Sequence, residues 1–354
     1  MRGNAKVAVL GGGSFGTVIA NILSGNGHDT TLWLRNPDDA EEINREHFNS
    51  RYLPEFPLNE NLKASTDLRQ SVSSCGVVFM AVPSSSSRQV ASTMKHWLAE
   101  GTLVVSMTKG IEAGSYKLMS QVLAEELPRA KIAVMSGPNL AREIAAGQMT
   151  GTVIASADTK VQQLVQSLLK SPNFRVYVNP DVFGVELGGA LKNIYAIVAG
   201  IGAAMNMGQN TVGMLLTRSL AEMSRFAVRM GANPMTFLGL SGVGDLIVTC
   251  MSPLSRNYQL GYQIGLGKSL EQTLVELGQV AEGLNTLQMV KQMADDSKVY
   301  MPLVSGLHAI LFAQKDIGEV ISGLMGGEQT TDVEFLQAID VMSASASDGS
   351  ADVQ

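Results

Sequence analysis

The segment from Lys6 to Gly16, KVAVLGGGSFG, decides the fold class of this chain. Its apolar, β-rich first half predicts a buried strand, and an apolar helix pattern follows from Phe15 to Ser24. The glycines fit G-x-G-x-x-G, a turn at which backbone N–H groups and a helix N-terminus can receive a pyrophosphate. The motif consists of Gly11, Gly13, Ser14, Phe15 and Gly16. A tight turn without a ligand is the alternative, but the position and spacing of the glycines favour a dinucleotide site.

Strand and helix patterns alternate through the rest of the first half. Further strands are predicted at 29–34, 77–82, 102–107 and 132–135, and helices at 38–49, 90–100 and 116–127. Several of these strands are apolar throughout, as strands covered on both faces are. The alternation therefore predicts an α/β fold of Rossmann type, with a doubly wound, mostly parallel sheet.

The second half is helical. Helix patterns occupy 191–204, 212–230, 270–277, 284–293 and 302–312, and strand patterns are nearly absent. We therefore expect a dinucleotide-binding domain at 1–187 and an all-helical substrate and catalytic domain at 188–341. The small, polar residues 342–354 are expected to form a disordered tail without chemistry.

Composition excludes several classes of function. The 354 residues are 45% hydrophobic and 16% charged, with a net charge of −6, which gives no electrostatic reason to bind nucleic acid or an anionic membrane. Cys75, Cys250 and four scattered histidines form no metal-binding or redox spacing, so we expect reduced, packed thiols and no metal. No signal peptide is recognisable, and the apolar run 194–205 is too short to cross a bilayer. We expect a cytoplasmic protein without membrane insertion.

Lys192 is the sharpest observation in the helical half, because it is the only charged residue between Glu186 and Arg218. An unpaired ammonium is costly to bury, and desolvation lowers a lysine pKa toward the range useful for proton transfer. The alternative is a packed stem whose ammonium reaches solvent. Asp245 lies in a second apolar stretch and could pair with Lys192, and Thr249 shares its face if that stretch is helical.

Other charged residues follow predicted strands or begin predicted helices. Arg35 follows the second predicted strand, at a position where an NAD enzyme usually has an acid. An arginine there can pair with the 2′-phosphate of NADP and therefore favours NADP. The alternative is an exposed arginine on a polar loop. Lys109 could bind a substrate anion or carbonyl, or be a solvated loop lysine. Ser255, Arg256 and Asn257 suit a phosphate, or a capped helix start with an exposed arginine.

Together these segments resemble the bacterial NAD(P)-dependent glycerol-3-phosphate dehydrogenases. The matching segments, in the order of that family, are GGGSFGT, LWLR, MTKGIE, MSGPN, ELGGALKNIYAI, GLSGVGDLIVTC, SRNYQLG and VAEG, between about Lys6 and Gly327. The resemblance implies reduction of dihydroxyacetone phosphate to sn-glycerol 3-phosphate, a phospholipid precursor, with NADP or NAD as the cofactor. Of the two, Arg35 favours NADPH. Hydride would reach C2, and Lys192 would be the general acid and base.

The resemblance also assigns roles residue by residue. It implies cofactor contacts by Ser14, Phe15, Arg35, Lys109, Ala141, Arg256, Val280 and Glu282. It implies substrate contacts by Lys109, Gly137, Asn139, Lys192, Asp245, Ser255, Arg256 and Asn257, with Asn193 and Thr249 beside the catalytic lysine. Asn139, Leu140, Phe15 and the run Ser84 to Ser87 depart from the family pattern without removing a charged catalytic group.

Two rival functions and a homodimer stay open at this point. Another two-domain dehydrogenase, of the 3-hydroxyacid or 6-phosphogluconate type, would also join a nucleotide domain to helices, but Asp245 and the segment Ser255 to Asn257 argue against it. A nucleotide-binding sensor without catalysis is the second rival. Retention of Lys192, Asp245 and Arg256 argues against that rival.

Overall fold

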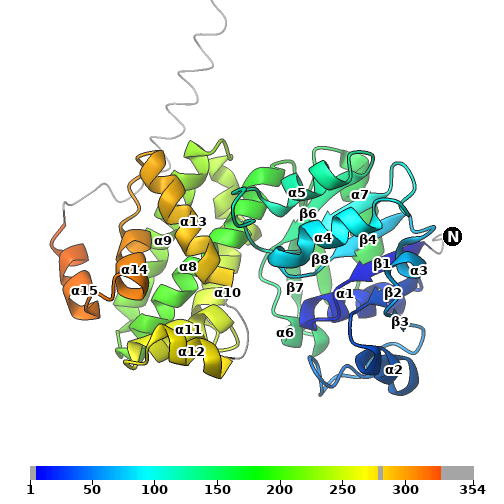
Figure 1. The fold of residues 1–354 in the computed structure, drawn as a ribbon, viewed down its shortest axis with the longest axis horizontal. Helices are drawn as coiled ribbons and strands as arrows, with labels where there is room; N and C mark the ends of the chain where they lie inside the picture. Colours follow the sequence, from blue (N-terminus) through cyan, green and yellow to red (C-terminus); the bar gives the residue numbers. More distant parts are fainter. Residues whose placement is uncertain (1–4, 278–281, 328–354) are drawn as a thin grey trace, which may run out of the picture. The chain divides into compact units, whose positions relative to one another are not determined.

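The computed structural model describes residues 5–277 and 282–327, which fold as two units that divide between Glu186 and Leu187. The strands belong to the first unit, and the described part of the second unit is helical (Figure 1). Residues 342–354, expected to be a disordered tail, lie outside the described residues.

The first unit is built on an eight-stranded sheet with the order β3-β2-β1-β4-β5-β6-β7-β8. The strands are β1 (Lys6–Leu10), β2 (Asp29–Trp33), β3 (Lys63–Ser65), β4 (Val77–Met80), β5 (Leu103–Ser106), β6 (Lys131–Ser136), β7 (Thr150–Ala155) and β8 (Phe174–Asn179). Neighbouring strands are parallel except β6 and β7. The order reverses at β1, between β2 and β4, and such a switch point is where doubly wound sheets bind ligands. The predicted fold class is confirmed.

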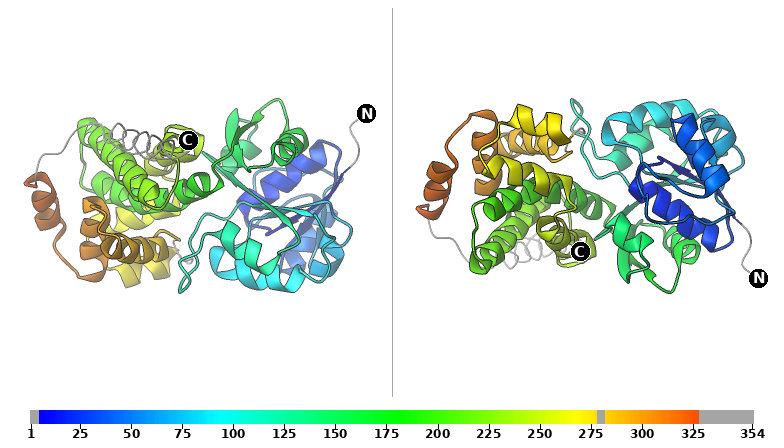
Figure 2. Two further views of the ribbon diagram at one scale, coloured as in Figure 1. Left: turned by 90° about the horizontal axis from the view of Figure 1, so that it is seen from above. Right: turned by 90° about the horizontal axis from the view of Figure 1, so that it is seen from below.

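Helices cover both faces of this sheet because its central strands are apolar on both sides. Along β1, Val7 and Val9 pack with α1 (Ser14–Gly25) and α7 (Thr159–Leu169). Ala8 and Leu10, on the other face, pack with α4 (Ser84–Met94) and α5 (Met119–Glu126). Figure 2 shows the blue α1 and the cyan α4 on opposite faces. The helices are α1 (Ser14–Gly25), α2 (Pro37–Glu46), α3 (Leu68–Val72), α4 (Ser84–Met94), α5 (Met119–Glu126), α6 (Ala141–Ala145) and α7 (Thr159–Leu169).

Several predicted boundaries in this unit were wrong. Helix α4 begins at Ser84 rather than Val90, so the serine run forms its first turn. Helix α2 ends at Glu46 rather than Asn49, because His47 adopts a left-handed conformation with φ of 57°. The strands β3, β7 and β8 were missed, since they are short or carry polar residues.

The second unit is a helical bundle around α8 (Val182–Ala204), which starts in the first unit. Gly200 on α8 and Gly261 on α11 (Arg256–Gly265) let the two helices approach closely, because a Cβ at either position would collide with the backbone of the other helix. The remaining elements are α9 (Gln209–Arg229), the 3-10 helix η1 (Pro234–Leu238), the π-helical turn η2 (Leu240–Gly244), α10 (Asp245–Met251), α11 (Arg256–Gly265), α12 (Leu270–Leu277), α13 (Glu282–Asp296), α14 (Pro302–Phe312) and α15 (Ile317–Met325).

Helix α8 is long and apolar enough to cross a bilayer, with a mean hydropathy of 1.3 over its most apolar window. The sequence interpretation had considered only the uncharged run 194–205, whereas the helix has 23 residues. In the structure 78% of that window is buried against protein, as in the core helix of a helical domain.

Glu186, near the start of α8, is buried and caps the N-terminus of α5. Its carboxylate accepts a hydrogen bond from the Ser120 N–H at 2.9 Å and another from the Ser120 hydroxyl. Burial raises the pKa of Glu186 to about 7 in spite of these bonds. The folded state therefore favours its protonated form more than the unfolded chain does.

This carboxyl makes stability depend on pH in a defined direction. The favourable contribution of the protonated carboxyl to the free energy of unfolding is fully present below pH 4.5, which is the ordinary pKa of Glu. It is lost as the pH rises through about 7, the pKa of Glu186 in the folded state. Glu186→Gln keeps the contacts with Ser120 but cannot ionise, so its melting temperature should rise relative to wild type between about pH 5 and pH 8. The corresponding gain in the free energy of unfolding is at most about 3 kcal/mol. Thermal unfolding across this range measures it, with the exposed Glu55→Gln as control. A constant difference would contradict the assignment.

Candidate active site

The glycine turn after β1 is shaped to admit a ligand at the N-terminus of α1. Gly11 has a φ of +120°, and a Cβ there would lie 2.6 Å from the Ala81 carbonyl oxygen. A Cβ at Gly16 would collide with the Gly11 carbonyl oxygen. Gly13 is the N-cap of α1, provides no side-chain cap, and has open space where its Cβ would be. The first-turn N–H groups of α1 can therefore receive a pyrophosphate, and the turn fits a dinucleotide.

Asn49 supports this turn and was missed as a functional residue. Its fully buried Nδ2 donates to the Gly12 carbonyl oxygen at 3.0 Å and to Thr17 Oγ1 at 2.8 Å. Ser14 is held in a similar way, since its hydroxyl donates to the Tyr52 carbonyl oxygen at 3.2 Å. A lone Asn beyond a predicted helix gives no periodic signal, so the sequence could not single out Asn49.

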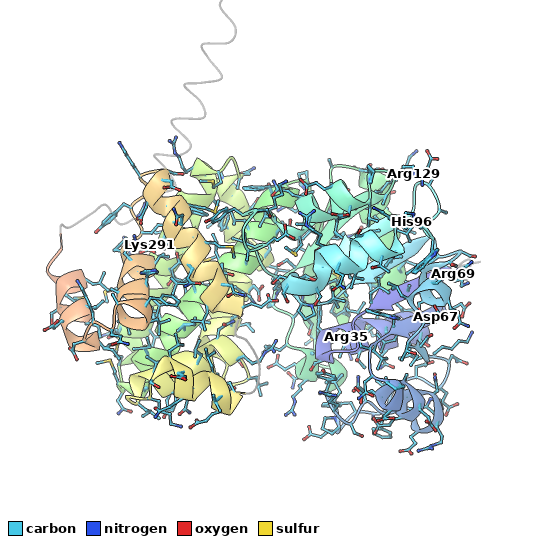
Figure 3. All side chains as sticks on the ribbon, in the orientation of Figure 1. Arg35, Asp67, Arg69, His96, Arg129 and Lys291 are labelled. Carbon is cyan, nitrogen blue, oxygen red and sulfur yellow. The ribbon has the colours of Figure 1, made fainter. Side chains whose placement is uncertain are left out.

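Arg35 lies two residues after the end of β2 and is exposed (Figure 3). The preceding Leu34 is buried against Gly12, where a Cβ would lie 2.7 Å from that of Leu34. Leu34, the residue before Arg35, therefore lies against the glycine turn. An exposed guanidinium in this place is available to a cofactor phosphate.

Lys109 follows β5, and its Nζ donates to the Gly137 carbonyl oxygen, 2.9 Å away, after β6. The preceding Thr108 donates its hydroxyl to the Val82 carbonyl oxygen at 2.7 Å, beyond β4. The carboxyl ends of three neighbouring strands are therefore tied together around Lys109. In open parallel sheets this edge is where ligands bind.

Asn139 follows β6 at this edge of the sheet. Only one of the two polar atoms of its side-chain amide forms a hydrogen bond with the described residues. Its Nδ2 donates to Thr152 Oγ1 at 3.0 Å, whereas its Oδ1 is buried without a hydrogen-bond partner among the described residues. A buried acceptor without a partner costs free energy, so it suits a ligand hydroxyl. Ala141 begins α6, whose N-cap Leu140 makes no side-chain cap. Phe15 and Ala141 pack against one apolar cluster.

Lys192 is buried, with 7% of the residue exposed, and lies in a polar cluster in the second unit. Its Nζ donates to Asp245 Oδ1, with which it forms an ion pair, and to Thr249 Oγ1 at 2.6 Å. Asp245 and Thr249 share one face of α10, as expected for a helix, and the Thr249 hydroxyl also lies 2.6 Å from the Asp245 carbonyl oxygen. The alternative in which the ammonium reaches solvent is wrong. The cluster holds an ammonium group with a fixed orientation in a dry environment.

Cys250 lies next to this cluster but is chemically inert. It is buried, and burial raises the pKa of its thiol to about 12, with Lys192 lowering it and Asp245 raising it further. Cys75 is also buried, and burial raises the pKa of its thiol. Both cysteines are free thiols, as the sequence predicted, and neither is activated as a nucleophile.

The segment from Ser255 to Asn257 begins α11. The Ser255 hydroxyl caps this helix by accepting from the Tyr258 N–H at 3.3 Å, and Arg256 is exposed. Asn257 is buried, and its Oδ1 accepts from the Gly283 N–H at 3.1 Å. A capped helix start with an exposed arginine is therefore present, and such a helix start can also bind an anion.

Gly283 lies close to two asparagines, Asn257 on α11 and Asn193 on α8. A Cβ at Gly283 would lie 2.6 Å from Asn257 Oδ1 and 2.9 Å from the carbonyl oxygen of Asn193, which is itself buried. Glu282 precedes it as the first residue of α13. Val280 lies outside the described residues. In the described ranges, 5–277 and 282–327, no group of three or more His, Cys, Asp or Glu side chains could hold a metal ion.

Comparison with known proteins covers both units. Residues 6–162 match the family described as NAD-dependent glycerol-3-phosphate dehydrogenase N-terminus, and residues 181–322 match the corresponding C-terminus. A glycerol-3-phosphate dehydrogenase [NAD(P)+] of Teredinibacter turnerae is 56% identical over 335 residues, 95% of this chain and 98% of the relative. The relative of the same name from Azotobacter vinelandii is 56% identical over 336 residues, with the same shares.

A solved structure agrees with these sequence relatives. The crystal structure of glycerol-3-phosphate dehydrogenase from Coxiella burnetii superimposes with a TM-score of 0.86 at 36% identity. The match covers 91% of this chain and 98% of that one. The two family matches and the structural match therefore extend over both units of the fold.

Proposed function

The chain belongs to the NAD-dependent glycerol-3-phosphate dehydrogenase family, and from this premise we propose how its residues reduce dihydroxyacetone phosphate to sn-glycerol 3-phosphate with NADPH or NADH. The single observation that carries the mechanism is the buried ammonium of Lys192, held by Asp245 and Thr249. This group can give a proton to a carbonyl oxygen and take one back in the reverse direction.

The proposed step balances as a hydride and a proton added across a carbonyl. A nicotinamide cofactor held at the glycine turn by Gly11, Gly13 and Ser14 would supply the hydride to C2 of the substrate. As the C2–H bond forms, the carbonyl π electrons move to oxygen, and Lys192 Nζ delivers a proton to that oxygen. Asp245 pairs with Nζ and orients it, and Thr249 fixes it from a second direction. Negative charge develops on the oxygen only near the transition state, so these interactions act mainly on turnover.

We assign the remaining residues as follows. The proposed cofactor contacts are Gly11, Gly13, Ser14, Phe15, Gly16, Arg35, Lys109, Ala141, Arg256, Val280 and Glu282. The proposed substrate contacts are Lys109, Gly137, Asn139, Lys192, Asn193, Asp245, Ser255, Arg256 and Asn257. Within the described residues Asn139 Oδ1 has no hydrogen-bond partner, which supports its assignment to a substrate hydroxyl. Because the Ser255 hydroxyl already caps α11, we expect Ser255 to contribute chiefly through the helix start.

The proposal extends to the setting of the enzyme. We propose a dinucleotide-binding role for residues 1–187 and a substrate and catalytic role for 188–341. Its product is a precursor of phospholipids. A cytoplasmic location and a homodimer without nucleic-acid partners complete the proposal.

A substrate panel tests this function directly. The purified chain should consume NADPH or NADH, followed by absorbance at 340 nm, with dihydroxyacetone phosphate. It should not do so with a 3-oxoacid, and should not reduce NADP⁺ with 6-phosphogluconate. Reduction of the 3-oxoacid, or oxidation of 6-phosphogluconate, as the preferred reaction would favour a rival dehydrogenase. Nucleotide binding without turnover of any substrate would favour a sensor.

Arg35 provides a test of cofactor preference. Its exposed guanidinium beside the glycine turn should favour NADPH by pairing with the 2′-phosphate, as the absence of an acid there also indicates. Arg35→Asp should shift the ratio of kcat/KM values toward NADH by about tenfold or more, since one lost charged hydrogen bond costs roughly 1.5–3 kcal/mol. Exposed Arg69→Asp serves as control. An unchanged ratio for Arg35→Asp would remove this residue from the cofactor site.

A further inference from the structure

The loop between β5 and α5 carries Lys109 and folds back on itself. Ile111 and Leu118 form an isolated antiparallel bridge, and the Glu112 N–H donates to the Lys117 carbonyl oxygen at 2.8 Å. Two residues, Gly110 and Ile111, separate Lys109 from Glu112, and both are buried. Movement of Glu112 would therefore be transmitted to the Lys109 backbone.

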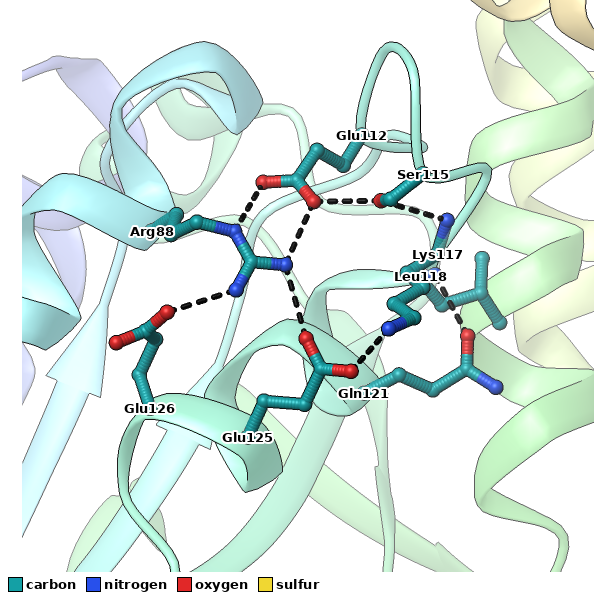
Figure 4. A network of polar contacts seen from close by, with 8 residues as sticks. All are labelled: Arg88, Glu112, Ser115, Lys117, Leu118, Gln121, Glu125 and Glu126. Atoms are coloured by element: carbon teal, nitrogen blue, oxygen red, sulfur yellow. Dashed lines mark hydrogen bonds and ion pairs between the residues drawn. The ribbon is translucent and has the colours of Figure 1, made fainter.

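Glu112 is fixed from outside the loop by Arg88 on α4 (Figure 4). The guanidinium makes a bidentate contact, with Nε 2.8 Å from Glu112 Oε1 and Nη2 2.7 Å from Oε2. Ser115 donates its hydroxyl to the same carboxylate at 2.5 Å. A planar, two-bond contact fixes orientation as well as distance, which a lysine could not reproduce.

The same guanidinium also holds α5. Its Nη1 lies 2.7 Å from Glu126 Oε1 and its Nη2 lies 3.0 Å from Glu125 Oε2, while Lys117 pairs with Glu125. Removing Arg88 would leave three carboxylates close together with Lys117 as the remaining cation of the network. Hydrogen bonding from Arg88 also lowers the pKa of Glu112 to about 2, so the pair stays ionised at any working pH.

From this geometry we propose that Arg88 and Glu112 are positioning residues that hold the β5–α5 loop so that Lys109 meets its ligands. Arg88 touches neither ligand in this proposal and acts through Glu112 on the backbone that carries Lys109. The inference rests on the proposed function, because it takes Lys109 to contact the cofactor and the substrate.

A double-mutant cycle between Arg88 and Lys109 tests the proposal. Two quantities are measured for each variant, namely the Kd for NADPH by titration calorimetry and the KM for dihydroxyacetone phosphate. Lys109→Met should weaken at least one of them by about tenfold or more, and Arg88→Met should weaken the same one by about tenfold. In the Lys109→Met background, Arg88→Met should change the same constant by less than about twofold, because Arg88 can no longer act through the Lys109 ammonium.

Matched controls separate positioning from general stability. Glu125→Gln and Glu126→Gln remove partners of the same guanidinium on α5 and should leave both constants within about twofold, whereas Glu112→Gln should behave like Arg88→Met. Arg88→Lys should not restore the constants, because it cannot form the bidentate contact.

Failure of the positioning proposal can be distinguished from failure of the proposed dehydrogenase function. If wild type does not turn over dihydroxyacetone phosphate, the proposed function fails. If wild type is active but Arg88→Met matches it, or if the effects of Arg88→Met and Lys109→Met simply add, the positioning role is overturned. Wild-type constants for Lys109→Met would overturn it as well, since nothing would then remain to be positioned.

Discussion

Lys192→Met should lower turnover by about 10²–10⁴-fold, while the Kd for NADPH stays within a few-fold of wild type. The substitution keeps much of the side-chain volume and removes the proton donor from the buried cluster. Because the lost interaction is made mainly in the transition state, the change should appear in kcat more than in binding. Steady-state kinetics and calorimetric titration measure the two effects separately.

Two companion variants make this result specific. Lys192→Arg should restore little turnover, because a guanidinium is too weak an acid to release a proton near neutrality. Lys192→Met also leaves Asp245 buried without its cation, which destabilises a protein by roughly 3–5 kcal/mol. Adding Asp245→Asn should recover much of the melting temperature but none of the turnover. Turnover of Lys192→Met within about threefold of wild type would contradict its role as general acid.

Arg256→Ala should weaken use of dihydroxyacetone phosphate by about 10- to 100-fold in kcat/KM, since a hydrogen bond to a charged group is worth roughly 1.5–3 kcal/mol. Arg256 is exposed at the capped start of α11, where the helix dipole also favours an anion. The proposal places Arg256 near the cofactor too, so NADPH binding can weaken as well.

Dihydroxyacetone, which lacks the phosphate, isolates the contribution of that group. With this poor substrate at saturating NADPH, Arg256→Ala and wild type should differ much less than with the phosphate ester. Exposed Arg229→Ala in the same unit is the matched control and should leave both reactions unchanged. Equal losses of Arg256→Ala on both substrates, or none on either, would show that Arg256 does not bind the phosphate.

The sequence predicted those features that depend on local pattern or on a rare residue. The run from Val7 to Leu10 and its glycine turn gave the correct strand, turn and helix, because apolar periodicity and absent side chains leave a visible signature. Lys192 was conspicuous because a single charge in an apolar helix needs a partner, and Asp245 supplies one across 53 residues of sequence.

Features set by tertiary contacts were not predictable. Strand β7 pairs antiparallel with β6, a choice made by chain topology rather than by residues 150–155. Asn49 and Arg88 gain their roles only from partners distant in the chain, Gly12 and Glu112. The helix that contains Ser84 to Ser87 was predicted to begin only at Val90, since serines suit both turns and the first turn of a helix.

Isotope tracing tests the central claim, reduction at C2 with a proton from the protein, most directly. The chain is incubated with dihydroxyacetone phosphate and NADPH that carries deuterium at the transferable position of the nicotinamide, and the product is analysed by NMR. The account predicts sn-glycerol 3-phosphate with deuterium at C2 alone and a hydroxyl proton exchanged with water. It also predicts at least about 10²-fold slower appearance of this product with Lys192→Met. Product without deuterium at C2, or equal rates for the two proteins, would contradict it.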